Sequence, residues 1–209
     1  NVTTKAYVAK NVTLTAGGTT IEATAGSGQS TFKAQATSGA GGSSVGVAGS
    51  IAVNIVVLDA SGTVEGADPV TINGNLTLTA ITLVDSQAIA LAKQEADGST
   101  SGIGASFALN VVNDTAIAGI ADGTGLAGVG TLTITATTTD TSTTTAEGGA
   151  AAGGSVALSA QVAITISNVT TSASIGSGSA TTISGGLTAT ATQTVTTTTK
   201  AKGATKGGN

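Results

Sequence analysis

The chain has 209 residues and a net charge of −4, from eleven carboxylates and seven lysines, and it contains no cysteine, histidine or arginine. These absences exclude disulfides, thiolate nucleophiles and cysteine-based zinc sites, and they leave no basic cluster for binding a nucleic acid. The 40% apolar fraction argues against disorder, and no apolar run reaches the ~18 residues of a membrane span.

A threonine-alternating pattern first occurs at residues 12–16 and returns at residues 76–80, 132–136 and 187–191, after 64, 56 and 55 positions. Alternating apolar and Thr side chains are typical of a strand with one buried and one hydrated face. If the copies stack in register, the threonines form two outward columns, Thr13/Thr77/Thr133/Thr188 and Thr15/Thr79/Thr135/Thr190.

A longer alternating segment follows at residues 45–55 and returns at residues 103–111. Val and Ile occupy one set of alternate positions in the first copy, and Gly, Ala and Ser occupy the other set. This period of two predicts a strand. Because the second face is small rather than charged, we expect another layer to approach it closely, so that the strand is covered on both sides.

A third, variable segment occupies residues 87–93, 143–147 and 196–202 and keeps a small column, Ala34/Ala90/Ala146/Ala201. Turn residues that permit positive φ or side-chain-to-backbone hydrogen bonds lie between the segments. The predicted turns are residues 59–62, 73–74, 97–98, 122–125 and 184–186.

No segment shows the 3.6-residue period of an amphipathic helix, so the chain is predicted to be all-β. The fold class that we expect is a β-solenoid, similar to a parallel β-helix, built from repeats of about 56 residues. A row of antiparallel β-sandwich modules is the main alternative, although 56 residues is short for such a module. The array divides into a partial repeat at 1–40, repeats at 41–96 and 97–151, and a repeat with a tail at 152–209.

The glycine-rich strand at residues 41–54, followed by Gly74-Asn75-Leu76-Thr77-Leu78-Thr79-Ala80, resembles the repeats of very large secreted bacterial proteins. These are the filamentous-haemagglutinin-like and leukotoxin-type filamentous adhesins. Similar copies cover nearly the whole chain, but the first is incomplete and carries an insertion near residues 17–28. The resemblance implies an elongated β-helical shaft at the cell surface, and it carries over no catalytic or binding residue.

Several aspartates invite a test for catalysis or metal binding: Asp59, Asp85, Asp97, Asp114, Asp122 and Asp140. We expect them to lie mostly one per turn, where Asp commonly bonds the backbone. The sequence around Asp122 is the nearest match to a calcium-binding turn, yet it has one carboxylate where a hard-cation site needs several. Asn113 and Asn168 open Asn-x-Thr motifs and are candidate glycosylation sites near strand ends. We therefore predict no enzyme, no cofactor and no metal site.

The regular Thr-x-Thr columns have a sharper alternative interpretation, because such arrays resemble the surfaces of ice-binding proteins. The candidate outer face consists of Thr13, Thr15, Thr77, Thr79, Thr133, Thr135, Thr188 and Thr190. Threonine is also an ordinary outward residue of a strand with few charges.

The sequence predicts a non-catalytic shaft or filament-forming segment of a large extracellular bacterial surface protein, an adhesin or a fibre. The alternative is a binding module that presents its Thr-rich faces to ice or to a host or surface glycan. Both ends lie within repeat-like sequence, which predicts an internal piece of something longer. We expect self-association, either head-to-tail or lateral, because the ends of a solenoid present open strand edges. We expect no nucleic-acid partner and no membrane span.

Overall fold

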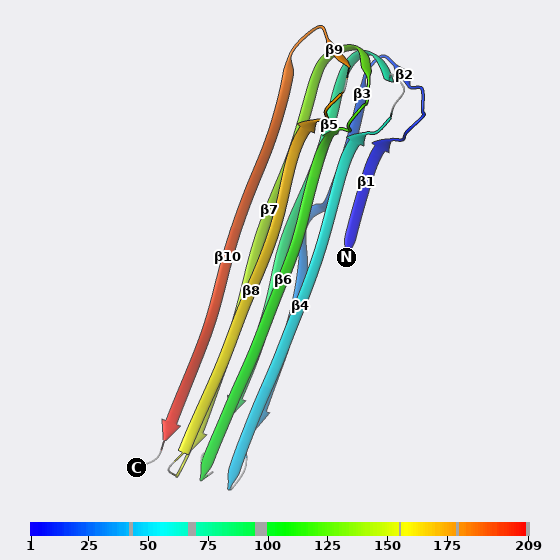
Figure 1. Cartoon of the computed structure of the whole chain (residues 1–209). Helices are drawn as coiled ribbons and strands as arrows, with labels where there is room; N and C mark the ends of the chain where they lie inside the picture. Colours follow the sequence, from blue (N-terminus) through cyan, green and yellow to red (C-terminus); the bar gives the residue numbers. More distant parts are fainter. Residues whose placement is uncertain (42–43, 67–69, 95–99, 155, 179, 208–209) are drawn as a thin grey trace.

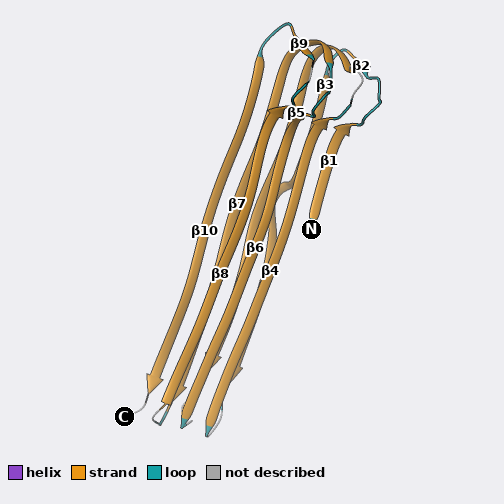
Figure 2. Cartoon of the chain, in the orientation of Figure 1, coloured by secondary structure: helices purple, strands orange, loops and turns teal. Residues whose placement is uncertain are grey.

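The protein is all-β in a computed structural model that describes residues 1–41, 44–66, 70–94, 100–154, 156–178 and 180–207. Long strands run the length of the molecule (Figures 1 and 2). The described ranges contain no helix with the length and apolarity that a membrane crossing needs.

The strands form two sheets, and all pairings within each sheet are parallel. Sheet A has the order β1-β4-β6-β8, with β1 Val2–Val8, β4 Val45–Val64, β6 Ser101–Ile120 and β8 Val156–Ile175. Sheet B contains β2 Thr15–Ala16, β3 Thr19–Ala40, β5 Val70–Gln94, β7 Leu126–Ala152, β9 Thr181–Ile183 and β10 Leu187–Gly207. The chain alternates between the sheets, and the strands of sheet B run opposite to those of sheet A (Figure 1).

The register follows the sequence spacing. Leu132 pairs with Leu76, 56 positions earlier, and with Leu187, 55 positions later. Sheet A keeps the same offsets, because Asn110 pairs with Asn54 and with Thr165. The prediction that Leu76, Leu132 and Leu187 lie beside one another is confirmed.

The interior changes character along the strands. The C-terminal halves of β4 and β6 turn larger apolar residues inward as well as alanines, and Val56 and Leu58 of β4 pack in one apolar cluster with Leu76 and Leu78 of β5. The N-terminal halves turn Gly, Ala and Ser inward, so the second cluster contains only alanines: Ala52, Ala88, Ala90, Ala108 and Ala146, with Ala36 and Ala163 beside them. The sheets come close there, because a Cβ on Gly104 would overlap the backbone carbonyl of Gly149.

A polar band separates the two clusters. The amide of Asn110 donates to the carbonyl of Ser86 (3.0 Å) and accepts from the Ser86 hydroxyl (2.6 Å). Asn54 donates to the Ser86 hydroxyl (3.0 Å), and Thr165 donates to the Thr144 hydroxyl (2.6 Å). These bonds join sheet A to sheet B, so the polar groups of this band bond to one another.

The expectation that the glycine-rich strand is covered on both sides is wrong for this chain. The small residues of β4 and β6 face sheet B, whereas the larger apolar residues face outward, and Ile51 is 69% exposed. The alternation was identified correctly, but an interior this thin accepts only the small face.

Two of the predicted turns are also wrong. Residues 59–62 lie within β4, and residues 73–74 lie within β5, where the register shifts beside Gly74. Gly62 serves close packing, because a Cβ there would overlap the carbonyl of Thr79. The turns at 122–125 and 184–186 lie between strands as predicted, and the turn at 97–98 falls outside the described residues.

Candidate functional site

The outer face of sheet B carries a threonine array that is longer than predicted. On β7 every outward position from 131 to 145 is Thr, and on β10 the outward positions from 188 to 198 are Thr. Six Thr–Thr pairs align across these two strands: Thr133–Thr188, Thr135–Thr190, Thr137–Thr192, Thr139–Thr194, Thr141–Thr196 and Thr143–Thr198. The array thus presents methyl and hydroxyl groups at the strand spacing of about 4.8 Å in one direction and about 6.6 Å in the other.

The array narrows toward β5 and β3. Thr77 and Thr79 of β5 continue the two predicted columns, because they pair with Thr133 and Thr135 of β7. The next outward positions of β5 are Ile81 and Leu83, which are not threonines.

Thr13 and Thr15 do not belong to the array. Thr20 pairs with Thr77 and Glu22 pairs with Thr79, whereas Thr15 pairs with Thr71 and Thr13 lies in the loop before β2. The 64-residue spacing is therefore the wrong register, because residues 19–23, seven positions later, are the ones that pair with residues 76–80.

The third predicted column also needs a correction in the first copy. Ala36, rather than Ala34, shares the column of Ala90, Ala146 and Ala201. The reason is a register shift between Ala25 and Ser30, where β3 contains additional residues.

The outer face of sheet A is apolar over the N-terminal halves of β4, β6 and β8. We call the outward side chains of residues 45–55, 101–111 and 156–166 the apolar face. Ser101 is the only polar side chain among these positions, and many of the others are well exposed, including Val47, Ile55 and Leu158. Exposed apolar surface on this scale commonly marks an interaction site.

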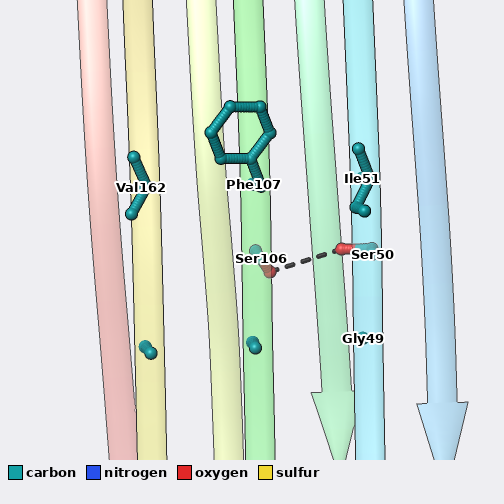
Figure 3. Close-up of a pocket in the computed structure, with 8 residues that line it drawn as sticks. Gly49, Ser50, Ile51, Ser106, Phe107 and Val162 are labelled. Carbon is teal, nitrogen blue, oxygen red and sulfur yellow. Dashed lines mark hydrogen bonds between the residues drawn. The ribbon is translucent and has the colours of Figure 1, made fainter.

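A groove crosses the apolar face from strand to strand. Its floor is the small column Gly49/Ala105/Ala160, and one of its walls is the column Ile51/Phe107/Val162. Figure 3 shows Ile51, Phe107 and Val162 in a row on three neighbouring strands. The hollow has a volume of about 490 Å³.

Hydrogen bonds hold the strands beneath this groove. Ser50 donates to Ser106 (3.3 Å), the bond drawn in Figure 3, and Ser106 donates to the carbonyl of Glu147 (2.6 Å) in sheet B. The hydroxyls point inward, so the groove itself offers almost no polar group. Its geometry suits an apolar ridge rather than a polar small molecule.

Most of the described aspartates lie in strands and not in turns, which corrects the prediction. Asp59 and Asp85 lie outward on β4 and β5, and Asp114 and Asp140 are buried on β6 and β7. Asp97 falls outside the described residues. Asp59 and Asp85 therefore point outward from different sheets, whereas Asp114 and Asp140 both point into the interior between the sheets.

The two buried aspartates replace apolar residues. Asp114 pairs with Leu58 and Val169, and Asp140 pairs with Val84. Asp140 accepts hydrogen bonds from the hydroxyls of Ser142 (2.8 Å) and Ser167 (2.5 Å).

Asp114 is only 1% exposed, and neither of its carboxylate oxygens has a hydrogen-bond partner among the described residues. Burial raises the pKa of Asp114 to about 6, and the nearby charge of Asp140 adds to this effect. The Thr82 hydroxyl and the Thr115 backbone N–H oppose the shift, but burial outweighs them.

Asp122 is the one described aspartate in a turn. Its Oδ1 accepts from the backbone N–H (2.7 Å) and the hydroxyl (3.1 Å) of Ser177, 55 positions later. This carboxylate therefore ties two neighbouring loops together. Among the described residues there is no group of three His, Cys, Asp or Glu side chains placed to hold a metal ion.

The candidate glycosylation sites lie within strands, which corrects their predicted place near strand ends. Asn168 donates to Asn113 (2.9 Å) on the outer face of sheet A. The two amides thus bridge neighbouring strands.

Comparison of the chain with protein-family models, curated proteins and solved structures found no match.

Sequence reasoning missed the exposure of the apolar face and the burial of Asp114 and Asp140. The first was not recoverable from alternation, which distinguishes two faces without saying which is buried. The second left a signal: an aspartate that replaces Leu58 and Val169 in an otherwise apolar column predicts a buried carboxylate.

Proposed function

We propose that this chain is a non-catalytic structural segment, a shaft or filament-forming piece, of a large extracellular bacterial surface protein such as an adhesin or fibre. We further propose that it is a β-solenoid in which each repeat of about 56 residues forms one two-stranded coil. The observation that supports this most is the register, in which Leu132 lies between Leu76 and Leu187 and the same offsets recur in both sheets.

Coils of this length build a broad tape rather than a thin rod. Strands of 20–27 residues extend about 65–90 Å at ~3.3 Å per residue, whereas each added coil lengthens the stack by only ~4.8 Å. The strands in Figure 1 lie along the longest dimension of the molecule. Parallel ladders of 20 and 21 registered pairs between neighbouring strands leave few exposed segments for proteases to open.

The location and the structural role are tested on the source cells. An antibody raised against the purified chain should label the outside of intact cells on extended structures seen by immunogold microscopy. Labelling that requires broken cells would overturn the extracellular role. Electron microscopy of the purified chain should show particles with one dimension of about 65–90 Å.

The second candidate function is a binding module that uses the threonine array on ice or on a glycan. The six aligned Thr–Thr pairs of β7 and β10 favour it, because a flat, regular and uncharged array suits an ordered ligand surface. Thermal hysteresis that disappears in Thr137→Lys/Thr192→Lys but persists in Thr115→Lys, on the outer face of sheet A, would support ice binding. Glycan arrays probed with the same variants test the other ligand.

A further inference from the structure

We propose that the apolar face of sheet A binds the same face of a second copy of this chain, so that two molecules pack sheet against sheet. The face comprises eighteen outward positions, six on each of β4, β6 and β8, and only Ser101 among them is polar. The side chains of Ile51 and Val47 are 69% and 60% exposed, so the rest of the chain covers little of this face. The pairing deepens the structural role proposed above. It rests on that proposal only in requiring that the strands stack into the two sheets.

The size of the apolar face suits a dimer. Eleven residues at ~3.3 Å and three strands at ~4.8 Å give a footprint of roughly 36 by 14 Å, or about 500 Å² on each copy. Two copies would bury about 1,000 Å², which reaches the lower limit for a specific protein interface. An aliphatic face with one phenylalanine packs well against a like face at the ~10 Å spacing of stacked sheets.

The charge of this face favours a protein partner over a membrane or a nucleic acid. No Lys, Asp or Glu occupies any of its eighteen positions, and the whole chain has a net charge of −4. Surfaces that bind anionic lipid or nucleic acid use clustered Lys and Arg. Two copies of an uncharged face meet without burying an unpaired charge.

The relief of the face is complementary to itself under a two-fold rotation. Each strand has a small residue beside a large one at its centre: Gly49 and Ile51, Ala105 and Phe107, Ala160 and Val162. The small residues form the groove and the large residues form the adjacent ridge. A rotation axis between the groove and the ridge therefore places the ridge of each copy in the groove of the other.

The axis that achieves this passes through Ser106, at the middle of β6. This axis lies in the interface and runs across the strands, so it places Phe107 of one copy over Ala105 of the second copy, and Ile51 of one copy over Gly49 of the second. The patch ends at equal distances on both sides of Ser106, at residues 101 and 111, so the whole face overlaps itself. This fit distinguishes a specific pair from non-specific hydrophobic contact.

Sedimentation of the full chain at micromolar concentration tests the pairing. We expect a dimer for the unchanged chain and a monomer for Phe107→Lys, with the dissociation constant raised roughly a hundredfold, as for a central interface residue. Thr139→Lys, which adds the same charge on the outer face of sheet B, should stay dimeric. Far-UV circular dichroism of each variant separates loss of pairing from loss of the fold.

A pair of shape variants makes the test specific. Ala105→Phe fills the groove and should abolish the dimer although it adds apolar surface. Ala105→Phe/Phe107→Ala exchanges ridge and groove, so the two-fold fit returns and the dimer should reappear. Stronger association of Ala105→Phe would contradict the interlocking geometry and overturn the proposal.

Other occupants of the face give distinct results. A folded monomer that floats with phosphatidylcholine vesicles, and loses this binding in Phe107→Lys, would assign the face to lipid and overturn the pairing. A folded monomer that binds no vesicles would also overturn it. Either result leaves the stacked structural segment standing, whereas loss of the β-sheet signal in the unchanged chain would count against the structural role itself.

Discussion

Gly62 on β4 lies against the backbone of Thr79 on β5, so close that a Cβ at position 62 would overlap the Thr79 carbonyl. This contact fixes the distance between the two sheets at that point. Gly62→Ala should therefore destabilise the protein by about 1–3 kcal/mol, the usual cost of overpacking. The midpoint of urea unfolding, followed by far-UV circular dichroism, measures the effect.

Gly49→Ala is the matched control, because a Cβ there meets nothing closer than the Ala105 carbonyl at 4.0 Å. Its neighbours in the column are already alanines. We expect a change in the free energy of unfolding within about 1 kcal/mol, with stabilisation favoured because alanine restricts the unfolded chain. Equal losses in both variants would contradict close packing at Gly62.

Asp114 gives the stability a specific pH dependence. Its pKa is about 6 in the folded chain against 3.8 for the free group, so the folded state holds the proton more tightly than the unfolded state. The stabilisation is therefore complete below pH 3.8 and is lost as the pH rises toward 6. A shift of this size corresponds to about 3 kcal/mol as an upper estimate.

Asp114→Val, which matches the Leu58 and Val169 neighbours in the column, should remove this loss. We expect the free energy of unfolding of the variant to exceed that of the unchanged chain by about 2–3 kcal/mol at pH 7 and by much less at pH 4. Asp59→Asn removes one outward negative charge and serves as the control. Urea unfolding at a series of pH values gives the free energy of unfolding of each protein as a function of pH. Parallel pH curves for Asp114→Val and the unchanged chain would refute the raised pKa of Asp114.

The polar band should contribute to stability through Asn110. Asn110→Ala leaves the buried Ser86 carbonyl and hydroxyl without the amide that bonds both, at a cost of about 2 kcal/mol. Asn113→Ala, three residues along the same strand, breaks only an exposed bond with Asn168 and should cost less than about 0.5 kcal/mol. Thermal unfolding of the two variants side by side measures the difference, and a reversed order would show that the band is not a stabilising network.

The sequence was sufficient to predict the columns, because stacked parallel strands place chemically similar residues beside one another. Leu76, Leu132 and Leu187 were found in this way, and Thr133 and Thr188 with them. The orientation of the glycine-rich strand was not predictable, since Ile51 and Ala52 alternate equally well whichever of them is buried. That choice depends on the distance between the sheets, which Gly62 and Gly104 allow to be small.

The first copy was misread because two similar segments compete. Residues 12–16 match residues 76–80 more closely than residues 19–23 do, yet the chain pairs Thr20, not Thr13, with Thr77. The later register shift between Ala25 and Ser30 then moved Ala36 into the column expected for Ala34. Local similarity cannot resolve such a choice, because register is decided by the packing of the whole strand.

The register of neighbouring strands carries the proposed solenoid, and it is measured most directly with paired pyrene labels on a chain that has no cysteine of its own. Thr77→Cys/Thr133→Cys places the labels on adjacent strands at registered positions, about 5 Å apart at the backbone. Thr77→Cys/Thr139→Cys separates them by about 20 Å along the strand. We predict strong excimer emission from the first pair and only isolated-pyrene emission from the second. Mixing with unlabelled chain should leave both spectra unchanged, which excludes excimers between labels on different molecules. Absence of excimer emission from the first pair, or equal emission from both, would contradict the stacked arrangement.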